Sequence, residues 1–569
     1  MMLGCATFAP WLLLVSSAAG QPEHAHFAAY LSQQLPLVAA ANDTDSQACH
    51  RACESLAATA GNDIIVHYGT IPDSFTSSFY AVQQRKITPL CVAQPQTVDG
   101  VSMTVRAVTK HRCRFAIKSG GHSNAPGTNA RQDGLVIDLK ALNSIEISRD
   151  NSTVLVGPGN IWSEVYEVLE PYGLVVSGGR VGSVGVGGFT MGGGISYLSR
   201  QYGWAVNNVR SFEVVLPNGT ITNASPGVNP DLYFALRGGG SSFGIVTRFD
   251  FEAFPHDAFW GGSDICLLHG LSATEKRLSM TSIQGFSLQR TAATAVQWLL
   301  RGLDWLGYAV NMSQIAESFT TLAHETQTDL SAHAYLFISN IPYVGTYITG
   351  STYVYSKGQP NPAALAPLTG VPHVHTTRGL PTLSKITKAI TDINPLDARQ
   401  HWRTSTFRVD AGLIVMFSDI FLQESAPIRW DIPDALVSSN VQLVTKHELD
   451  LFQKNGGNAF GLGPEDGPLM FISMSVAYKH AKDDDAVESM TKRIHERIEA
   501  VGKEMGLHHP FIYPNYAAVG QDVFAGYKQD NLKRLLNIQA RYDPGRVFAN
   551  LQPAHLTLNE ERVKRYTWL

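Results

Sequence analysis

The sequence has little that would suit a nucleic-acid-binding or a membrane protein. Its formal net charge is -4 over 569 residues, and no run of basic residues interrupts it, so a nucleic-acid partner is not expected. No segment reaches the roughly 18 uninterrupted apolar residues that a membrane-spanning helix needs. Repeats of fixed period and low-complexity tracts are absent as well. We therefore expect a globular chain without a membrane partner.

Strong metal-ligand signals are also missing. The sequence contains no Cys-x-x-Cys pair, which is the usual mark of a structural zinc site. His373 and His375 form a His-Val-His triplet that could place two ligands on one strand face. A solvated strand is the favoured interpretation of this triplet, and no metal is predicted.

Cysteine is scarce, and the few cysteines are unevenly placed. Apart from Cys5 there are five: Cys49, Cys53, Cys91, Cys113 and Cys266. An odd number cannot pair completely, so one or two disulfides near the N-terminus are expected if the compartment is oxidising. Cys49 and Cys53 stand one helical turn apart, which leaves their partners open.

The N-terminus predicts secretion. Residues 1–20 contain an apolar stretch, residues 8–15, followed by small residues suited to a cleavage site, although a cationic start is missing. Asn-x-Ser/Thr sequons occur at Asn42, Asn151, Asn218, Asn223 and Asn311. Together these features predict a secreted glycoprotein with a signal peptide over residues 1–20.

Composition and periodicity indicate a large α+β protein. With 44% hydrophobic and 16% charged residues, the chain can bury a large core and form two domains. Apolar spacing predicts strands over residues 63–68, 115–118, 135–139, 153–156, 212–216 and 245–254, and helices over residues 98–109, 161–169 and 531–540. The glycine-rich texture changes near residue 256, which predicts an inserted domain and a tail that returns to the first one.

The most informative segment is residues 116–123, Ala-Ile-Lys-Ser-Gly-Gly-His-Ser. Ser119, Gly120 and Gly121 follow a strand and offer backbone N–H groups with little side-chain bulk, as in a phosphate-binding turn. His122 would hold an imidazole beside the bound anion. The alternative is an ordinary glycine turn with a surface histidine.

Two other glycine motifs match known patterns less well. The dinucleotide fingerprint that begins at Gly157-Pro158-Gly159 requires a third glycine where Trp162 stands, so we reject a Rossmann loop. Residues 240–244 match the Gly-x-Ser-x-Gly of a hydrolase nucleophile, Ser242, but a strand follows where that motif requires a helix. A serine hydrolase remains a remote alternative.

A second long glycine-rich segment extends over residues 178–194, with nine glycines among apolar Val, Phe and Met. A flexible linker would carry polar residues instead. Bare backbone of this kind can lie against a planar ligand or around a pyrophosphate. The first domain therefore has two loops that could hold phosphate.

These motifs together resemble the secreted FAD-linked oxidases of the berberine-bridge-enzyme-like family, whose flavin domain is of the PCMH type (vanillyl-alcohol-oxidase-like). The resemblance covers residues 60–256 and 510–555. The motifs that carry it are KSGGHS (118–123), SVGVGG with GGG (183–194), GGGSSFGIVT (238–247), YPNY (513–516) and YDPGRVF (542–548).

The resemblance implies a domain plan. It predicts a two-part FAD-binding domain over residues 21–256, with its PCMH-type core at about 85–256. An α+β substrate domain of antiparallel sheet covered by helices is inserted over residues 257–505. A C-terminal segment over residues 506–569 returns to the FAD domain.

The resemblance also implies FAD as cofactor and His122 as the residue bonded covalently to the flavin ring. The cofactor-binding residues that it implies are Lys118, Ser119, Gly120, Gly121, His122, Ser123, Gly178, Ser183, Val184, Gly185, Gly187, Gly188, Gly193, Gly194, Gly244, Ile245, Val246 and Asn515.

The chain departs from the family pattern at the second flavin link. Doubly linked members carry a cysteine where this sequence has Val181. The resemblance thus implies a single covalent link, through His122 only. Val184 stands where the family leaves room for dioxygen, which favours an oxidase over a dehydrogenase.

The residues that act as catalytic base in related enzymes are not found at the matching positions of this sequence. Ile195 replaces a tyrosine found in plant-type members, and residues 455–461 lack the acid of the alkaloid enzymes. Glu465 and Asp466 lie beyond that stretch, in a turn typical of a solvated loop.

Tyr516, and after it Tyr513, are the candidate bases. A free tyrosine, with a pKa of about 10, is a poor base unless a cation or the flavin lowers that value. Trp204 and Tyr197 could line the pocket or belong to the core.

The expected activity is oxidation of a small alcohol or amine, such as a secondary-metabolite intermediate. Hydride would pass to FAD, dioxygen would be the acceptor and hydrogen peroxide the second product. A secreted carbohydrate oxidase of the same family is the alternative, although those enzymes usually carry the doubly linked flavin. A third possibility is a protein that binds flavin but no longer catalyses a reaction.

Overall fold

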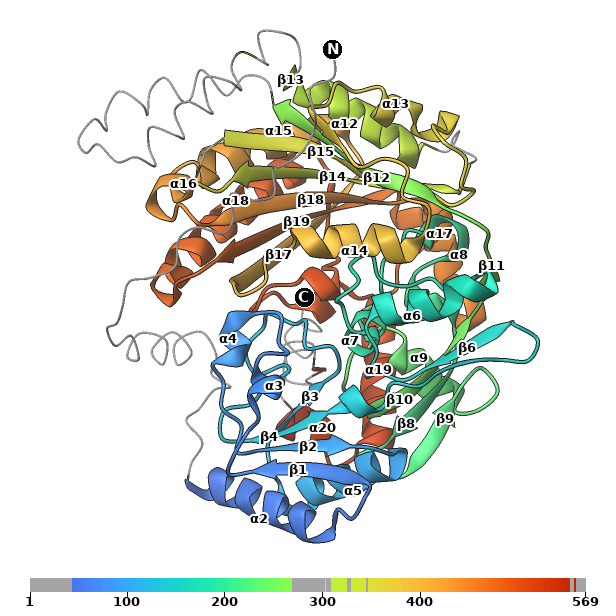
Figure 1. Cartoon of the computed structure of the whole chain (residues 1–569), viewed down its shortest axis with the longest axis vertical. Coiled ribbons are helices and arrows are strands. Elements are labelled where there is room, and N and C mark those ends of the chain that lie inside the picture. The colour runs from blue at the N-terminus through green and yellow to red at the C-terminus, as the bar shows by residue number, and fades with distance from the viewer. Residues whose placement is uncertain are drawn as a thin grey trace. The chain divides into compact units, whose positions relative to one another are not determined.

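The computed structural model describes residues 43–268, 302, 309–324, 329–343, 346–552 and 557–558. The predicted signal peptide and the sequon at Asn42 lie outside the described residues. The fold is mixed α+β, as predicted, and its elements are labelled in Figure 1.

The first sheet contains the strand that leads into the KSGGHS loop. Its order is β1 (Ile64–Tyr68), β2 (Cys91–Pro95), β4 (Leu135–Asp138) and β3 (Phe115–Lys118). β1 pairs antiparallel with β2, and the other pairs are parallel. β3 has the predicted bounds, and the predicted helix is α5 (Val98–His111), which begins at the capping residue Thr97.

Two disulfides fasten the N-terminal helix α2 (Asp43–Thr59) to this sheet. Cys49 is bonded to Cys113 and Cys53 to Cys91. The two cysteines of the helix therefore reach different partners, at the end of α5 and on β2. Cys266 is buried and free.

The second sheet is antiparallel, with the order β5 (Ile145–Ile147), β6 (Thr153–Val156), β10 (Ile245–Glu252), β8 (Val209–Val215) and β9 (Ile221–Ala224). β6 has the predicted bounds. β8 covers most of the strand predicted over 212–216 and forms a hairpin with β9 around residues 217–219. The predicted helix over 161–169 is α6 (Trp162–Leu169), which follows β6.

A large sheet forms the upper part of Figure 1. Within the described residues its order is β13 (Ala309–Val310), β12 (Trp260–Leu268), β15 (Thr346–Tyr355), β14 (Ala332–Ile341), β18 (Leu436–Val444), β19 (Leu469–Tyr478), β17 (Arg399–Arg408) and β20 (His508–His509). The short strand β16 (His375–Thr376) pairs with β12.

Both faces of this sheet are buried, and β19 shows how. Met470, Ile472 and Met474 belong to the core shared with three helices, α12 (Met312–Thr320), α15 (Ala411–Ser425) and α18 (Asp484–Glu504). Leu469 and Phe471, on the alternate positions, belong to the core shared with the first half of the chain. Because successive side chains of a strand point to opposite faces, β19 packs against the three helices on one face and against the first half of the chain on the other.

The C-terminal segment packs against the first half of the chain. Helix α19 (Gln529–Tyr542), predicted over 531–540, contacts α9 (Pro230–Leu236). Phe548, on α20 (Val547–Leu551), meets Phe115 of β3 edge to face, with ring centroids 5.6 Å apart. The domain limits predicted from the sequence stay predictions.

One stretch, Ala411–Asp431, is long and apolar enough to cross a membrane by composition alone, and half of it is buried inside the protein. It contains α15, which packs against α12 and α18. A core helix has the same composition, so this stretch is no more than weak evidence for a membrane span.

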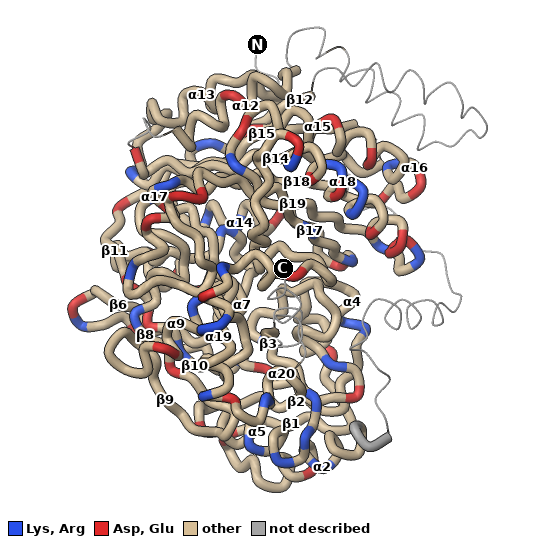
Figure 2. Tube along the Cα trace, turned by 180° about the vertical axis from the view of Figure 1, so that it is seen from behind, with Lys and Arg blue, Asp and Glu red and all other residues tan. Residues whose placement is uncertain are grey.

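Charged residues of both signs alternate along the trace (Figure 2). In the part of the chain that the structure describes, no group of His, Cys, Asp and Glu has the arrangement of a metal site. His375 is exposed at the start of β16, and His373 precedes it.

The disulfide between Cys53 and Cys91 closes a loop with a sequence separation of 38. Replacing both cysteines with alanine should lower the free energy of unfolding by about 2–4 kcal/mol, because the unfolded chain regains loop entropy. Urea unfolding measures the change. Cys266→Ala, which breaks no disulfide, is the control for the loss of a buried thiol. A double variant no less stable than this control would contradict the expectation.

Candidate functional site

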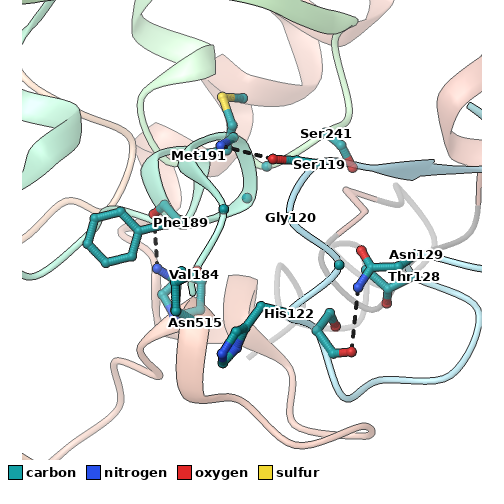
Figure 3. Close-up of a pocket in the computed structure, with 18 of the residues that line it drawn as sticks. Ser119, Gly120, His122, Thr128, Asn129, Val184, Phe189, Met191, Ser241 and Asn515 are labelled. Carbon is teal, nitrogen blue, oxygen red and sulfur yellow. Dashed lines mark hydrogen bonds between the residues drawn. The ribbon is translucent and has the colours of Figure 1, made fainter. Parts of the chain in front are cut away.

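A cavity of about 320 Å³ lies where the two glycine-rich loops meet the tail and the large sheet. The first loop contributes residues 119–124, and the second contributes Val184, Gly185, Gly187 and Gly188. The start of β10, the YPNY segment and Trp402 of β17 complete the wall. Figure 3 shows part of this wall, with His122, Val184 and Asn515 around the space. Five segments that are distant in the sequence thus form one site.

The two glycine loops touch each other through their backbones. A Cβ atom placed on Gly120 would lie 2.5 Å from the Cα of Gly185, and one on Gly185 would lie 2.4 Å from the nitrogen of Gly120. Such distances exclude any side chain at either position. Ser119 joins the loops further, because its hydroxyl accepts a hydrogen bond from the N–H of Gly187 (3.3 Å).

The loop at residues 157–159 also reaches this site, although it is not a Rossmann loop. Ser119 donates its hydroxyl proton to the carbonyl oxygen of Pro158 (2.5 Å), and Pro158 lines the cavity. Gly157 and Gly159 each lie against backbone oxygens of residues 139–142, which leaves no room for a Cβ atom. These glycines serve close packing beside the cavity.

His122 lies in the cavity wall with one ring nitrogen unsatisfied. Its Nε2 atom is buried and has no hydrogen-bond partner among the described residues. The ring stacks on that of Tyr80, with centroids 3.9 Å apart and planes 9° apart. Burial lowers the pKa of His122 to about 4. At neutral pH the imidazole is therefore uncharged and can act as a nucleophile.

The far part of the cavity carries aromatic side chains and one cation. The ring of Tyr516 stacks on Trp402, with centroids 5.3 Å apart. Arg180 donates a hydrogen bond from Nη2 to the hydroxyl of Tyr516, at 2.7 Å. All three residues line the cavity. A phenolic hydroxyl, a cation and an aromatic wall thus lie together.

Tyr513 lines the same cavity, but its hydroxyl is already engaged. It accepts hydrogen bonds from the backbone N–H of Ile195 and from Nδ2 of Asn515, both at 3.1 Å. Burial raises the pKa of Tyr513 above its ordinary value. The Asn515 amide also donates to the carbonyl of Phe189, a bond drawn in Figure 3. Tyr513 and Asn515 thus fasten the tail to the second glycine loop.

Most of the residues predicted for the site come together in the cavity wall. Those that line it are Ser119, Gly120, Gly121, His122, Ser123, Val184, Gly185, Gly187, Gly188, Gly244, Ile245, Val246, Tyr513, Asn515 and Tyr516. Val181, at the position of the missing cysteine, lines it too. Those outside the wall are Lys118, Gly178, Ser183, Gly193 and Gly194.

Lys118 lies behind the wall, in a buried ion pair. Its Nζ atom is 3.1 Å from Oδ1 of Asp138, and both side chains are almost fully buried. The ammonium group also lies 5.6 Å from the ring centroids of Phe75 and Phe79. The ion pair joins β3 to β4, and loss of either partner would leave the other charge buried and unpaired.

Three glycines outside the wall make room for aromatic rings. A Cβ atom on Gly178 would lie 2.3 Å from the Trp162 ring, and one on Gly193 would lie 2.7 Å from the Trp204 ring. A Cβ atom on Gly194 would likewise lie too close to the Phe189 ring. Part of the glycine content of residues 178–194 thus reflects packing around the site.

The residues that carried the alternative interpretations of the sequence do not line the cavity. The Ser242 side chain is fully buried, its hydroxyl accepts from the N–H of Leu558, and the strand β10 follows it. No helix begins where a nucleophile elbow requires one. Glu465 pairs with Lys528 outside the cavity wall. Tyr197 and Trp204 are buried core residues and do not line the cavity.

Among the wall residues that were not predicted from the sequence, three contribute a charge or an aromatic ring: Arg180, Trp402 and Tyr80. Arg180 stands alone between glycine and valine in the second glycine segment, and this isolated charge is the one signal that could have revealed it. Trp402 and Tyr80 come from distant segments without any local motif. Their contribution depends on how β17 and residues 79–81 pack against the loops.

The wall fits FAD. The backbone of Gly120, Gly121, Gly185, Gly187 and Gly188 carries no side chains and offers N–H groups for a pyrophosphate. The buried and unpartnered Nε2 atom of His122 suits a ring bonded to this imidazole. The residues that would hold the cofactor are those of the two glycine loops and the start of β10.

Comparison with known proteins agrees with this geometry. The family described as FAD binding domain matches residues 89–225. The FAD-dependent monooxygenase tpcD of Cochliobolus heterostrophus is 31% identical over 534 residues, which cover 90% of this chain and 95% of that protein.

Solved structures show the same fold at low identity. One is 6-hydroxy-D-nicotine oxidase of Arthrobacter nicotinovorans (TM-score 0.66, 16% identity, 87% of this chain and 97% of that one). Another is berberine bridge enzyme of Eschscholzia californica (TM-score 0.64, 15% identity, 89% and 98%). The chain belongs to the family of FAD-dependent oxidoreductases that includes tpcD, and it has the fold of berberine bridge enzyme and related oxidases.

Proposed function

We propose that this protein is an oxidase that holds FAD covalently through His122 alone, oxidises a small organic alcohol or amine, and reduces dioxygen to hydrogen peroxide. The observation that carries the proposal is the neutral imidazole of His122, whose buried Nε2 atom lacks a partner beside the two glycine loops. Val181 lines the same cavity and has no thiol, which supports a single link.

FAD, when bound, supplies the acceptor for two electrons and a proton. The chain's own residues orient the substrate and remove the second proton. Tyr516 is the proposed proton acceptor, because its hydroxyl lies in the cavity wall and faces a cation rather than a backbone donor. To accept a proton, Tyr516 must act as a phenolate, and Arg180, at 2.7 Å, stabilises that anionic form before the proton is transferred. Trp402 covers the Tyr516 ring and limits its movement.

Tyr513 has a different role in this proposal. Its hydroxyl accepts two hydrogen bonds, and its ring packs edge to face on Tyr516, with centroids 4.8 Å apart. It therefore positions Tyr516 and closes the tail over the second loop.

The fate of dioxygen distinguishes two related activities. Val184 lines the cavity at the place that the family leaves open to dioxygen, which supports an oxidase. The relative tpcD is named a monooxygenase, which makes incorporation of an oxygen atom into the product the second candidate.

We also propose that the protein is secreted and glycosylated. Two disulfides in the N-terminal part suit an oxidising compartment. The sequon residues Asn151, Asn218, Asn223 and Asn311 are all exposed, so a glycosyltransferase could reach them.

His122→Ala should abolish covalent flavin attachment. Acid-precipitated wild-type protein should stay yellow, because a covalent bond survives unfolding, whereas the variant should release its flavin into the supernatant. Absorbance of pellet and supernatant measures this. His375→Ala, which changes an exposed histidine outside the cavity wall, should retain the flavin. Release of flavin from the wild type would refute the covalent link.

Tyr516→Phe should lower kcat/KM by about 10²- to 10⁴-fold, as expected for loss of a general base. Tyr513→Phe should lower it less, and should instead reduce the free energy of unfolding by about 1 kcal/mol through its lost hydrogen bonds. Steady-state kinetics and urea unfolding of both variants measure the contrast. A larger kinetic loss in Tyr513→Phe would reverse the assignment.

A peroxide-release screen over sugars, alcohols, amines and aromatic metabolites should identify the substrate class. An oxidase releases one hydrogen peroxide for each substrate oxidised, and isotopically labelled dioxygen leaves no label in the product. Labelled product would establish the monooxygenase instead, and turnover of sugars would favour the carbohydrate oxidase. If no compound bleaches the flavin, the protein binds flavin without turnover.

A further inference from the structure

Arg180 is the one strongly charged residue in the cavity wall. Among the residues that line the cavity in the described part of the chain, none is Asp, Glu or Lys, and no other is Arg. His122 contributes no charge at neutral pH, because burial lowers its pKa to about 4. The protein side of the cavity is therefore cationic.

The protein itself satisfies the Arg180 guanidinium only in part. Nη2 donates to Tyr516, but Nη1 is buried and has no hydrogen-bond partner in the described residues. The group lies over the rings of Tyr335 (5.0 Å to the centroid) and Tyr197 (6.0 Å). These rings attract the cation through their faces but accept no hydrogen bond of ordinary strength.

Besides the tyrosines around it, two titratable groups interact with Arg180, and neither neutralises it. His333 is buried on the large sheet, and burial holds its pKa well below the ordinary value, so it is uncharged. The carboxylate of Glu448 accepts hydrogen bonds from the N–H and the hydroxyl of Thr445, at 2.8 and 3.1 Å. Burial raises the pKa of Glu448 to about 7. Neither group provides Arg180 with a full counter-charge.

We propose that Arg180 determines substrate specificity by binding an anionic oxygen of the substrate. A buried cation without a paired anion is unfavourable, and the planar fork of arginine can hold Tyr516 on one side and a carboxylate, phenolate or enolate oxygen on the other. Arg180 lines the cavity wall, so a ligand in the cavity lies within reach of its guanidinium group.

This inference rests on the proposed function, and it narrows the substrate class. The oxygen bound by Arg180 lies beside the hydroxyl of Tyr516, so the reacting part of the molecule is placed next to the proposed base. The aromatic wall formed by Trp402 and Tyr516 suits an apolar or aromatic body. A small aromatic or polyketide-like molecule with an acidic oxygen meets both conditions, and a neutral sugar does not.

Binding of benzoate and of its neutral isostere benzamide tests the proposal on the full flavin-loaded protein by calorimetry. The wild type should bind benzoate about 10- to 100-fold more tightly, as expected for a charge-assisted hydrogen bond. Arg180→Met should lose this preference, whereas Arg180→Lys, which keeps the charge, should retain part of it. Tyr516→Phe should keep it, because the cation remains.

Ionised para-nitrophenol, compared with para-nitroanisole, shows whether a phenolate or a carboxylate is preferred. Equal binding of acid and amide by the wild type, absence of binding by either anion, or a preference that persists in Arg180→Met would overturn the proposal. So would a loss of flavin from Arg180→Met with the preference intact, since Arg180 would then hold the cofactor. Failure of the covalent link or of oxidase turnover leaves these binding ratios unchanged, so the two proposals fail separately.

Discussion

The contact between the backbones of Gly120 and Gly185 is the constraint on which the site depends. Neither position has room for a Cβ atom, so the two loops can meet only as bare chain. Their meeting allows Ser119 to bridge Pro158 and Gly187. It also sets His122 in the wall beside the second loop. Any side chain at either glycine would separate the loops and open the space that the flavin is expected to fill.

The large sheet contributes a further part of the cavity wall, next to the part formed by the two glycine loops. Because β19 is buried on both faces, the sheet can pack against its own helices and against the first half of the chain at once. This packing brings Trp402 of β17 over Tyr516 of the tail, and brings Tyr335 of β14 beneath Arg180. The side of the cavity where the substrate is proposed to bind is thus assembled from the second glycine loop, the large sheet and the tail, which share no sequence motif.

The polar side chains of the cavity have different proposed roles. His122 is neutral because burial removes its charge, which suits a nucleophile that bonds a flavin. Arg180 keeps its charge, because an arginine side chain stays protonated in proteins, and faces a hydroxyl rather than an acid. No acidic side chain lines the described wall, so proton removal is assigned to Tyr516 and recognition of an anionic oxygen to Arg180.

The sequence by itself determined the local elements, the family and the cofactor loops. β3 and β6 were predicted to the residue, because short apolar runs next to glycine turns admit few alternatives. Tertiary structure alone decided which cysteines pair, since Cys49 and Cys53 are equivalent by spacing but face α5 and β2 respectively. The tertiary structure also places Lys118 in an ion pair behind the cavity wall. It brings Arg180, Trp402 and Tyr80 into the cavity wall. Periodicity and glycine pattern report on neighbours along the chain, whereas these contacts join residues tens to hundreds of positions apart, and only packing can choose among them.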